Sequence, residues 1–261
     1  MSSSSLRRFA VLLAVLALAS LACEPTDVDR FFLERGRTPP AEPARSQLAR
    51  IGSAFEAERD RRNSFVGSID TVDETRLGLS WRPSCPVTPA QLRLLRLSYW
   101  GFDDQAHVGE LIVNVQIAER VVGAFREMWN AKFPINTMVT AERFARPSDF
   151  DSSGTYIEPT PGPDNVNDTS AFFCRPATGG GPYSQHAYGL AIDINPVQNP
   201  YIKGFKLVPT NGAPYLDRAN ASPGMNVKGS VSVRAMTAAG LTWGGTWGSL
   251  KDYMHFSLNG R

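Results

Sequence analysis

The chain changes character near Leu77, and this change limits which residues can build a folded core. Between the N-terminal leader and about residue 80 the sequence is charged, rich in proline at 39–43, and without a sustained apolar period. Such a composition buries too little apolar surface to offset the entropy lost on ordering. From Leu77 onward, aromatic residues, glycines and short apolar runs leave roughly 180 residues for one core. We expect a tether over 23–80, with one helix pattern at 47–61, and a single folded domain over 81–261.

The first 22 residues have the three parts of an export signal. Arg7 and Arg8 precede an apolar stretch over 9–19, and the small Ala22 stands directly before Cys23. The apolar stretch is too short for a permanent membrane span. Cleavage before Cys23 leaves two alternatives open, a lipid on Cys23 or free secretion. The expected location is therefore extracytoplasmic, as a secreted protein or an anchored lipoprotein of a bacterial cell envelope.

Charge and cysteine content restrict the partners of the mature chain. Loss of residues 1–22 removes two arginines and leaves 25 basic residues against 25 acidic ones. Without a dense basic run, nucleic acid is excluded as the main partner, and membrane contact is expected only through a lipid on Cys23. Cys85 and Cys174 suit a disulfide in an oxidising compartment, with two buried free thiols as the alternative. We expect a monomer.

Apolar periodicity predicts the elements of the folded part. One stripe of four residues, Ile117, Val121, Phe125 and Met128, has helical spacing. Helices are expected over 88–97, 115–132 and 231–239, strands over 110–113, 135–140, 190–194 and 253–258, and a surface loop over 151–163. Because helices and strands alternate irregularly and no glycine-rich phosphate loop occurs, we predict an α+β fold with a mainly antiparallel sheet flanked by helices.

Two short segments carry the residues best suited to chemistry. In the first, Leu190, Ile192 and Ile194 alternate with polar or small residues, so Asp193 should point away from the apolar face of a strand. Gly189 permits the turn that would bring His186 to the same side. In the second, His255 lies between two apolar residues of the other strand face. Two imidazoles and one carboxylate, with a fourth position open for water, are typical of a catalytic zinc site.

A base is needed beside the zinc-bound water, and Asp252 lies three residues before His255. Zinc lowers the pKa of its water to roughly 7, and a carboxylate can then take the proton as the peptide carbonyl is attacked. Arg175 has the permanent charge and donor fork to neutralise a substrate carboxylate or the developing oxyanion. His107 lacks a partner at ligand spacing and is interpreted as structural. Trp243 and Trp247 fit either a pocket wall or the core.

These residues carry a family resemblance. The segment Ser184–Asn195 contains Ser-x-His-x(6)-Asp, and Asp252 with His255 forms an acid-x-x-His motif. Together they resemble the D-alanyl-D-alanine carboxypeptidase family, which includes the vancomycin-resistance dipeptidases and phage L-alanyl-D-glutamate endolysins. The stretches 99–110 and 170–175 are also similar to that family. Many members have Glu where this chain has Asp252, the endolysin branch uses the shorter acid, and the loop over 152–164 is longer than usual.

The resemblance implies a fold, a cofactor and an activity. The fold would be hedgehog-like and D-Ala-D-Ala-peptidase-like, with Zn²⁺ held by His186, Asp193 and His255. Asp252 would be the catalytic acid and base, and Ser184 and Arg175 would contact the substrate. The expected function is a secreted zinc metallopeptidase, a hydrolase that cleaves peptide bonds next to D-amino acids in peptidoglycan stem peptides. Composition and spacing alone indicate only an exported metal hydrolase.

Three other readings remain open at this stage. A non-haem iron oxygenase also uses two histidines and one carboxylate, although its first two ligands usually lie two residues apart. A zinc-bearing module that binds wall peptide or protein without cutting it is the main alternative, and a purely structural envelope lipoprotein is the third. Asp252 separates the peptidase from the binding module, because only hydrolysis requires a base at that place.

Overall fold

The computed structural model describes residues 53, 64–151, 157, 166–177 and 181–260. The chain divides into two compact units, Met1–Ser64 and Phe65–Arg261, and the second is described below. The predicted signal peptide, Cys23 and the tether up to residue 63 lie outside the described residues, apart from the helical Ser53. The same holds for most of the loop expected over 151–163. Among the described residues, no helix combines the length and apolarity that crossing a membrane requires.

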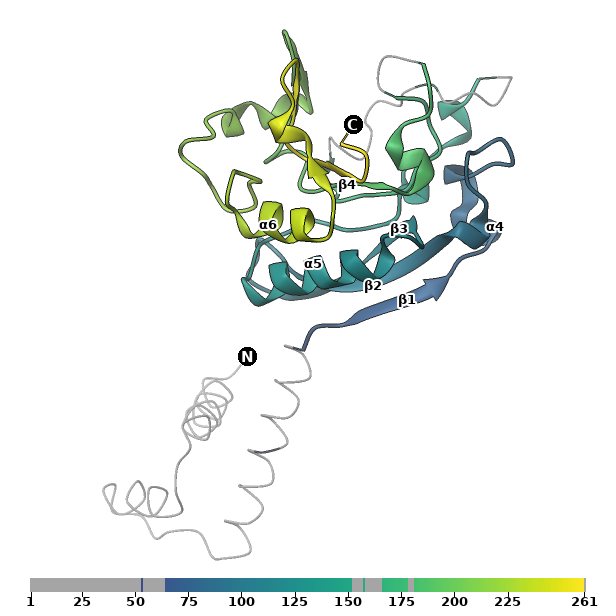
Figure 1. Cartoon of the computed structure of the whole chain (residues 1–261), viewed down its shortest axis with the longest axis horizontal. Coiled ribbons are helices and arrows are strands. Elements are labelled where there is room, and N and C mark those ends of the chain that lie inside the picture. Colours follow the sequence, from purple (N-terminus) through teal and green to yellow (C-terminus); the bar gives the residue numbers. More distant parts are fainter. Residues whose placement is uncertain (1–52, 54–63, 152–156, 158–165, 178–180, 261) are drawn as a thin grey trace, which may run out of the picture. The chain divides into compact units, whose positions relative to one another are not determined.

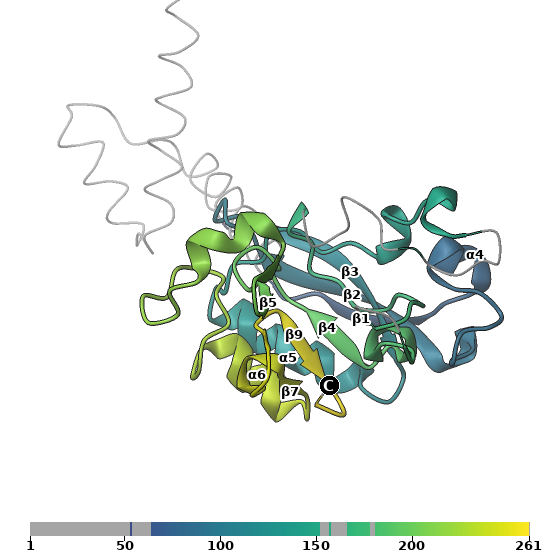
Figure 2. The same cartoon turned by 90° about the horizontal axis from the view of Figure 1, so that it is seen from above.

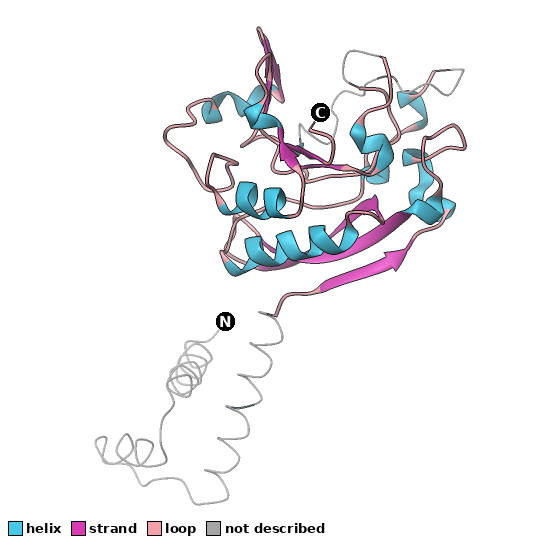
Figure 3. Cartoon of the chain, viewed as in Figure 1, coloured by secondary structure: helices cyan, strands magenta, loops and turns pink. Residues whose placement is uncertain are grey.

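The described part of the second unit contains three antiparallel sheets, shown with the helices in Figures 1 and 3. The sheet strands are β1 (Gly67–Thr71), β2 (Leu92–Trp100), β3 (Ala106–Asn114), β4 (Ala191–Asp193), β5 (Tyr201–Lys203), β6 (Lys206–Val208), β7 (Thr242–Trp243), β8 (Lys251–Asp252) and β9 (His255–Ser257). The α-helices are α4 (Glu74–Leu77), α5 (Ala118–Asn130) and α6 (Val231–Ala238). The orders are β1-β2-β3, β4-β9-β7 and β6-β5-β8. The predicted α+β class is confirmed, with antiparallel pairing divided among small sheets.

Strand β2 occupies the place where the sequence predicted a helix over 88–97, so that prediction is wrong. Thr88 caps only a single 3₁₀ turn, Pro89–Gln91. In β2, Leu95 and Leu97 enter the main core, whereas Leu92 and Leu94 enter a second apolar cluster. A strand buried on both faces has no polar alternation, and its run of leucines is therefore hard to distinguish from a helix.

The helix predicted over 115–132 is confirmed as α5. Its stripe of Ile117, Val121, Phe125 and Met128 is buried and joins the main core. The helix packs against β2 and α6, and Figure 1 shows it lying along the sheet with α6 beside it. The helix predicted over 231–239 is also confirmed, and Gly240 follows it with a φ of 83°, the left-handed conformation that ends helices. In the view of Figure 1, α5, α6 and the β1-β2-β3 sheet lie beneath the β4-β9-β7 sheet.

The segment predicted as a strand over 135–140 forms isolated bridges only. Pro134 bridges to Trp100, and Thr137 bridges to Asp168. Side chains occupy the amide groups that a neighbouring strand would otherwise use: Asn195 Oδ1 accepts from the Asn136 amide at 3.0 Å, and Asp168 Oδ1 accepts from Val139 at 3.0 Å. The apolar pattern of residues 135–140 correctly predicted that the segment has buried side chains, but it did not predict which groups bond its backbone.

The compact unit begins before the expected boundary at residue 81. Strand β1 lies within the segment interpreted as a tether, and its five residues pair with Leu97 to Arg93 of β2. Helix α4 follows directly, with Asp73 accepting from the Arg76 amide at its N-terminus and Leu77 fully buried. Because β1 covers an edge of β2, about fifteen residues upstream of 81 contribute to the sheet rather than to a linker.

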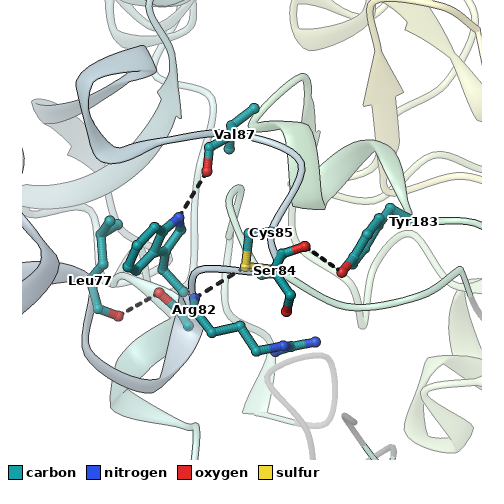
Figure 4. Close-up of a disulfide and its surroundings, with 9 residues drawn as sticks. Leu77, Arg82, Ser84, Cys85, Val87 and Tyr183 are labelled. Atoms are coloured by element: carbon teal, nitrogen blue, oxygen red, sulfur yellow. Dashed lines mark hydrogen bonds between the residues drawn. A yellow bond between two sulfur atoms is a disulfide. The ribbon is translucent and has the colours of Figure 1, made fainter. Parts of the chain in front are cut away.

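A disulfide joins Cys85 to Cys174, which confirms the predicted pair. The two Cα atoms are 5.9 Å apart, across 89 positions of sequence. Figure 4 shows the surrounding contacts: the Trp81 indole donates to the Val87 carbonyl at 2.8 Å, and the Tyr183 hydroxyl donates to the Ser84 carbonyl at 2.7 Å. The bridge therefore ties the loop after α4 to the chain that runs toward Ser184.

Removing this bridge is expected to lower the free energy of unfolding. Closing a loop of that length restricts the unfolded chain by roughly 4 to 5 kcal/mol on the loop-entropy model. A Cys85→Ser, Cys174→Ser double variant should show this loss in urea-induced unfolding of the zinc-free chain. Reduced wild type is the control and should match the variant, whereas a loss below about 1 kcal/mol would contradict the expectation.

Candidate metal centre

Strands β4 and β9 bring the predicted ligands together. Asp193 and His255 are directly opposed in the antiparallel register, so their side chains leave the same face of the sheet. The Asp193 backbone is held from the other edge, where its amide donates to Ser170 O at 2.8 Å and its carbonyl accepts from Ser170 N at 3.0 Å. The alternation that predicted the direction of Asp193 is thereby confirmed. Figure 2 shows the two strands lying side by side above α5.

His186 reaches the same point from a short 3₁₀ helix, Gln185–Tyr188. The Ser184 hydroxyl caps this helix and accepts from the His186 amide at 3.3 Å. Gly189 ends it with a φ of 66°, and a Cβ there would lie 2.7 Å from the Asn114 amide nitrogen. Only glycine combines that conformation with that close approach. The turn expected at Gly189 is therefore confirmed, and it aims His186 at the strand pair.

Three side chains converge at this place, and they are the only group of this kind among the described residues. His186 Nε2 lies 3.1 Å from Asp193 Oδ2 and 3.2 Å from His255 Nδ1, and His255 Nδ1 lies 3.0 Å from Asp193 Oδ1. Ligand atoms bonded to a tetrahedral zinc ion lie roughly 3.3 Å apart at bond lengths of about 2.0 Å. The donor set and its spacing therefore fit zinc.

The backbone sets which nitrogen of His186 faces the cluster. Its Nδ1 donates to the Ala171 carbonyl at 2.6 Å, which leaves Nε2 facing Asp193 and His255. Metal-binding histidines commonly have such an outer partner, which selects the tautomer and the ring plane. The Trp247 ring centroid lies 5.4 Å from that of His255 and forms an aromatic wall on this side. A sequence pattern could not identify the Ala171 carbonyl, because every residue has one.

Electrostatics support a charged centre. All three residues are buried, with exposed fractions of 4% for His186, 7% for Asp193 and 6% for His255. Burial by itself favours the neutral carboxyl, but the positive charge and hydrogen bonds of the two imidazoles outweigh it and hold the pKa of Asp193 far below its ordinary range. An ionised carboxylate between two histidines is the state that a divalent cation binds.

The other predicted site residues lie on neighbouring elements. Asp252 is half-buried in β8, opposite Tyr201 of β5. A Cβ on Gly244 would lie 2.5 Å from the Asp252 carbonyl oxygen, so this glycine allows the chain to pass close to the acid. Arg175 is half-buried beside the disulfide, and its carbonyl accepts from the Ser184 amide at 3.1 Å. The structure thus brings the Arg175 and Ser184 segments side by side.

The structure also shows where His107 and Trp243 lie. The His107 ring lies 3.0 Å from Asp103 and stacks on Tyr99, with 39% of its side chain exposed. His107 lies outside the cluster of three and pairs with its own acid, Asp103, which agrees with its interpretation as a structural residue. Trp243 is buried and donates to the Tyr253 carbonyl at 2.8 Å, which assigns it to the core.

A polar cluster beside the two ligand-bearing strands was not predicted from the sequence. Asn199 donates to the Ile194 carbonyl at 3.0 Å, directly after Asp193, and Asn226 donates to the Tyr253 carbonyl at 3.0 Å, two residues before His255. The Arg218 guanidinium links the two asparagines by donating to Asn199 Oδ1 at 2.9 Å and to Asn226 O at 2.7 Å. Burial lowers the pKa of Arg218 to about 10, although the charge interaction with Tyr253 raises it. The cluster joins the ends of both ligand-bearing strands.

An α+β domain with a buried His–Asp–His cluster belongs to a broad class, the proteins with a candidate divalent-metal site. A comparison with family models narrows it: residues 178–258 match the model described as D-alanyl-D-alanine carboxypeptidase. The family resemblance drawn from the two motifs is confirmed over this segment, which supports a peptidase in general terms. The match includes Ser184, all three candidate ligands and Asp252, but not Arg175. No significant match was found among curated proteins or among solved structures.

Proposed function

We propose that this chain is a zinc-dependent peptidase that hydrolyses bonds next to D-amino acids in peptidoglycan stem peptides. The observation that carries the proposal is the buried cluster of His186, Asp193 and His255, whose donor atoms lie within 4.8 Å of one another inside the family-matched segment. Export, with or without a lipid on Cys23, is part of the same proposal, because the substrate lies outside the cytoplasm.

Each residue then has a distinct role in hydrolysis. His186 through Nε2, His255 through Nδ1 and Asp193 would hold the zinc ion, which when bound supplies Lewis acidity and a water of lowered pKa. Asp252 takes the proton from the attacking water. It then returns that proton to the leaving amine nitrogen, which would otherwise depart as an unstable anion. The buried walls keep other water from the centre and strengthen these charge interactions.

Arg175 and Ser184 are proposed as substrate contacts. The Arg175 Nη1 donates to the Pro176 carbonyl at 3.2 Å, and its backbone is bonded to the segment that begins with Ser184. A guanidinium on this segment can pair bidentately with the terminal carboxylate of a stem peptide or with the oxyanion that forms on the scissile carbonyl. The disulfide at Cys174 restrains the neighbouring backbone and so limits the positions that Arg175 can adopt.

A non-hydrolytic zinc module would need the same three ligands but no acid beside them. Asp252 favours the enzyme, because a half-buried acid three residues before His255 suits proton transfer, a role that a binding module does not require. The iron oxygenase alternative is disfavoured by the family match and by the seven-residue separation of His186 and Asp193.

The deciding experiment is mass spectrometry of defined muropeptides incubated with the zinc-loaded protein. We expect loss of D-Ala, loss of a D-Ala-D-Ala dipeptide, or cleavage of the L-Ala-D-Glu bond, and the mass of the product identifies which. Chelator-treated protein should be inactive, and zinc should restore turnover. Intact muropeptides at full zinc occupancy would overturn the enzyme proposal, and iron with 2-oxoglutarate turnover would replace it.

A further inference from the structure

The hairpin of β5 and β6 has an unpacked aromatic residue at its tip. Phe205 is 110% exposed, more than in an extended reference peptide, so it contributes no burial to the fold. It follows Gly204, whose φ of 56° suits a tight two-residue turn. In Figure 1 the hairpin is the green strand pair that rises at the upper edge of the compact unit, next to the yellow segment that contains its partner strand β8. The ring is therefore available for contact with a partner.

Two lysines flank this tip and face each other. Lys203 and Lys206 are both exposed, and they form the last directly opposed pair of the hairpin register. Like charges opposite each other destabilise a strand pair, and no acidic residue occurs between Tyr201 and Val208 to offset them. The tip therefore combines an apolar ring with a concentrated positive charge, which complements an anionic partner that also offers a flat, weakly polar surface.

The register connects the lysine pair to the catalytic acid. Tyr201 is opposed by Val208 on one side and by Asp252 on the other. Opposed residues share a sheet face, as do residues two apart on one strand, so Lys203 and Lys206 leave the same face as Tyr201 and Asp252. Burial and the charge of Asp252 raise the pKa of Tyr201, which agrees with a shared face. The lysine pair is one strand step beyond Tyr201, roughly 7 Å along the sheet.

We propose that the β5–β6 hairpin is an extended substrate subsite that binds the carboxylate-bearing part of polymeric peptidoglycan. In this arrangement Lys203 and Lys206 pair with free carboxylates of stem peptides, and Phe205 packs on the C–H face of a sugar ring of the attached glycan. The inference rests on the proposed function and extends it, because it assigns a preference for polymer-attached, acidic substrate over short neutral peptide.

The test is co-sedimentation of the zinc-loaded chain with purified sacculi, in an Asp252→Asn background that leaves the wall uncut. A Lys203→Glu, Lys206→Glu variant should raise the apparent Kd about tenfold or more, with the difference shrinking at high salt. Phe205→Ser should weaken binding independently of salt. Lys228→Glu reverses an exposed lysine outside the hairpin and is the matched control, expected to change Kd less than about twofold.

A second measurement separates carboxylate recognition from general charge. On soluble stem peptides, the double reversal should raise KM more for a peptide with free side-chain carboxylates than for the same peptide amidated. The proposal would be overturned if the hairpin variants bound sacculi as well as wild type does, or if Lys228→Glu lost as much binding as they do. It would also be overturned if the hairpin were needed for binding to phosphatidylglycerol vesicles but not for binding to sacculi. Phe205→Ser keeps the test valid if the double variant fails to fold, because Phe205 has no packing to lose.

Sedimentation does not depend on cleavage, so the two proposals fail separately. If muropeptides stay intact while the hairpin still binds sacculi, the hydrolytic function is wrong and the subsite stands as a wall-binding surface. If muropeptides are cut while the hairpin variants bind as well as wild type, only the subsite is wrong.

Discussion

Asp252→Asn is expected to reduce peptide hydrolysis by roughly 10²- to 10⁴-fold, the range that a positioned acid and base contributes. Asparagine keeps the size of the side chain and its place in β8, but it can neither accept the water proton nor pass it to the leaving amine. Zinc content should stay at the wild-type level, because Asp252 is not among the three residues whose donor atoms converge. The measurement is single-turnover cleavage of a muropeptide together with metal analysis.

Asp217→Asn is the matched control for this change. It is the same substitution at an exposed acid whose hydrogen bonds are local, to the amides of Ala219 and Asn220. Activity of this control should remain within about twofold of wild type, as for most surface changes. Turnover by Asp252→Asn at the wild-type rate would remove this residue from the mechanism. Loss of zinc together with activity would instead make it part of the metal site.

His255→Ala is expected to have the largest effect on the metal. It deletes one of three ligands and leaves the Asp193 carboxylate, buried to 7% exposure, with one imidazole in place of two. Loss of a residue that only hydrogen-bonds a metal ligand lowers metal affinity by up to about 100-fold, so loss of the ligand itself should lower zinc affinity by more than that. Hydrolysis should fall to background. Competition with a chromophoric chelator measures the affinity.

Thermal unfolding provides an independent readout of the same change. A ligand that binds only the folded state stabilises it in proportion to its affinity, so zinc should raise the Tm of wild type and not of His255→Ala. His107→Ala is the control, since His107 is exposed and paired with Asp103 outside the cluster. It should bind zinc as wild type does. A zinc-dependent rise in Tm that survives in His255→Ala would contradict the ligand assignment.

The candidate site was largely readable from the sequence because its information is local. Asp193 was predicted to leave the apolar face of its strand from the alternation of Leu190, Ile192 and Ile194, and the register confirms it. Gly189 was predicted to turn the chain, and its left-handed φ confirms it. Both predictions depend on geometry within a few residues, which the backbone transmits directly.

The errors share one physical cause, which is that neighbours distant in sequence decide the outcome. Residues 92–97 form a central strand because β1 and β3 lie on either side, whereas their leucine spacing alone permits a helix. Residues 135–140 make isolated backbone bonds to β2 and β3, and side chains of Asn195 and Asp168 accept from the amides of Asn136 and Val139. Neither partner can be inferred from the segment itself.

The sequence alone determined the donor set, the two motifs, the cysteine pair and the α+β class, because residue type and short-range periodicity carry them. Only the tertiary structure decided which nitrogen of His186 faces the centre, how Arg218 and two asparagines tie the ligand strands together, and that Lys203 and Lys206 share a face with Asp252. Those properties are relations between separate segments of the chain, or depend on backbone carbonyls that every residue has, so no pattern in the chain marks them before it folds.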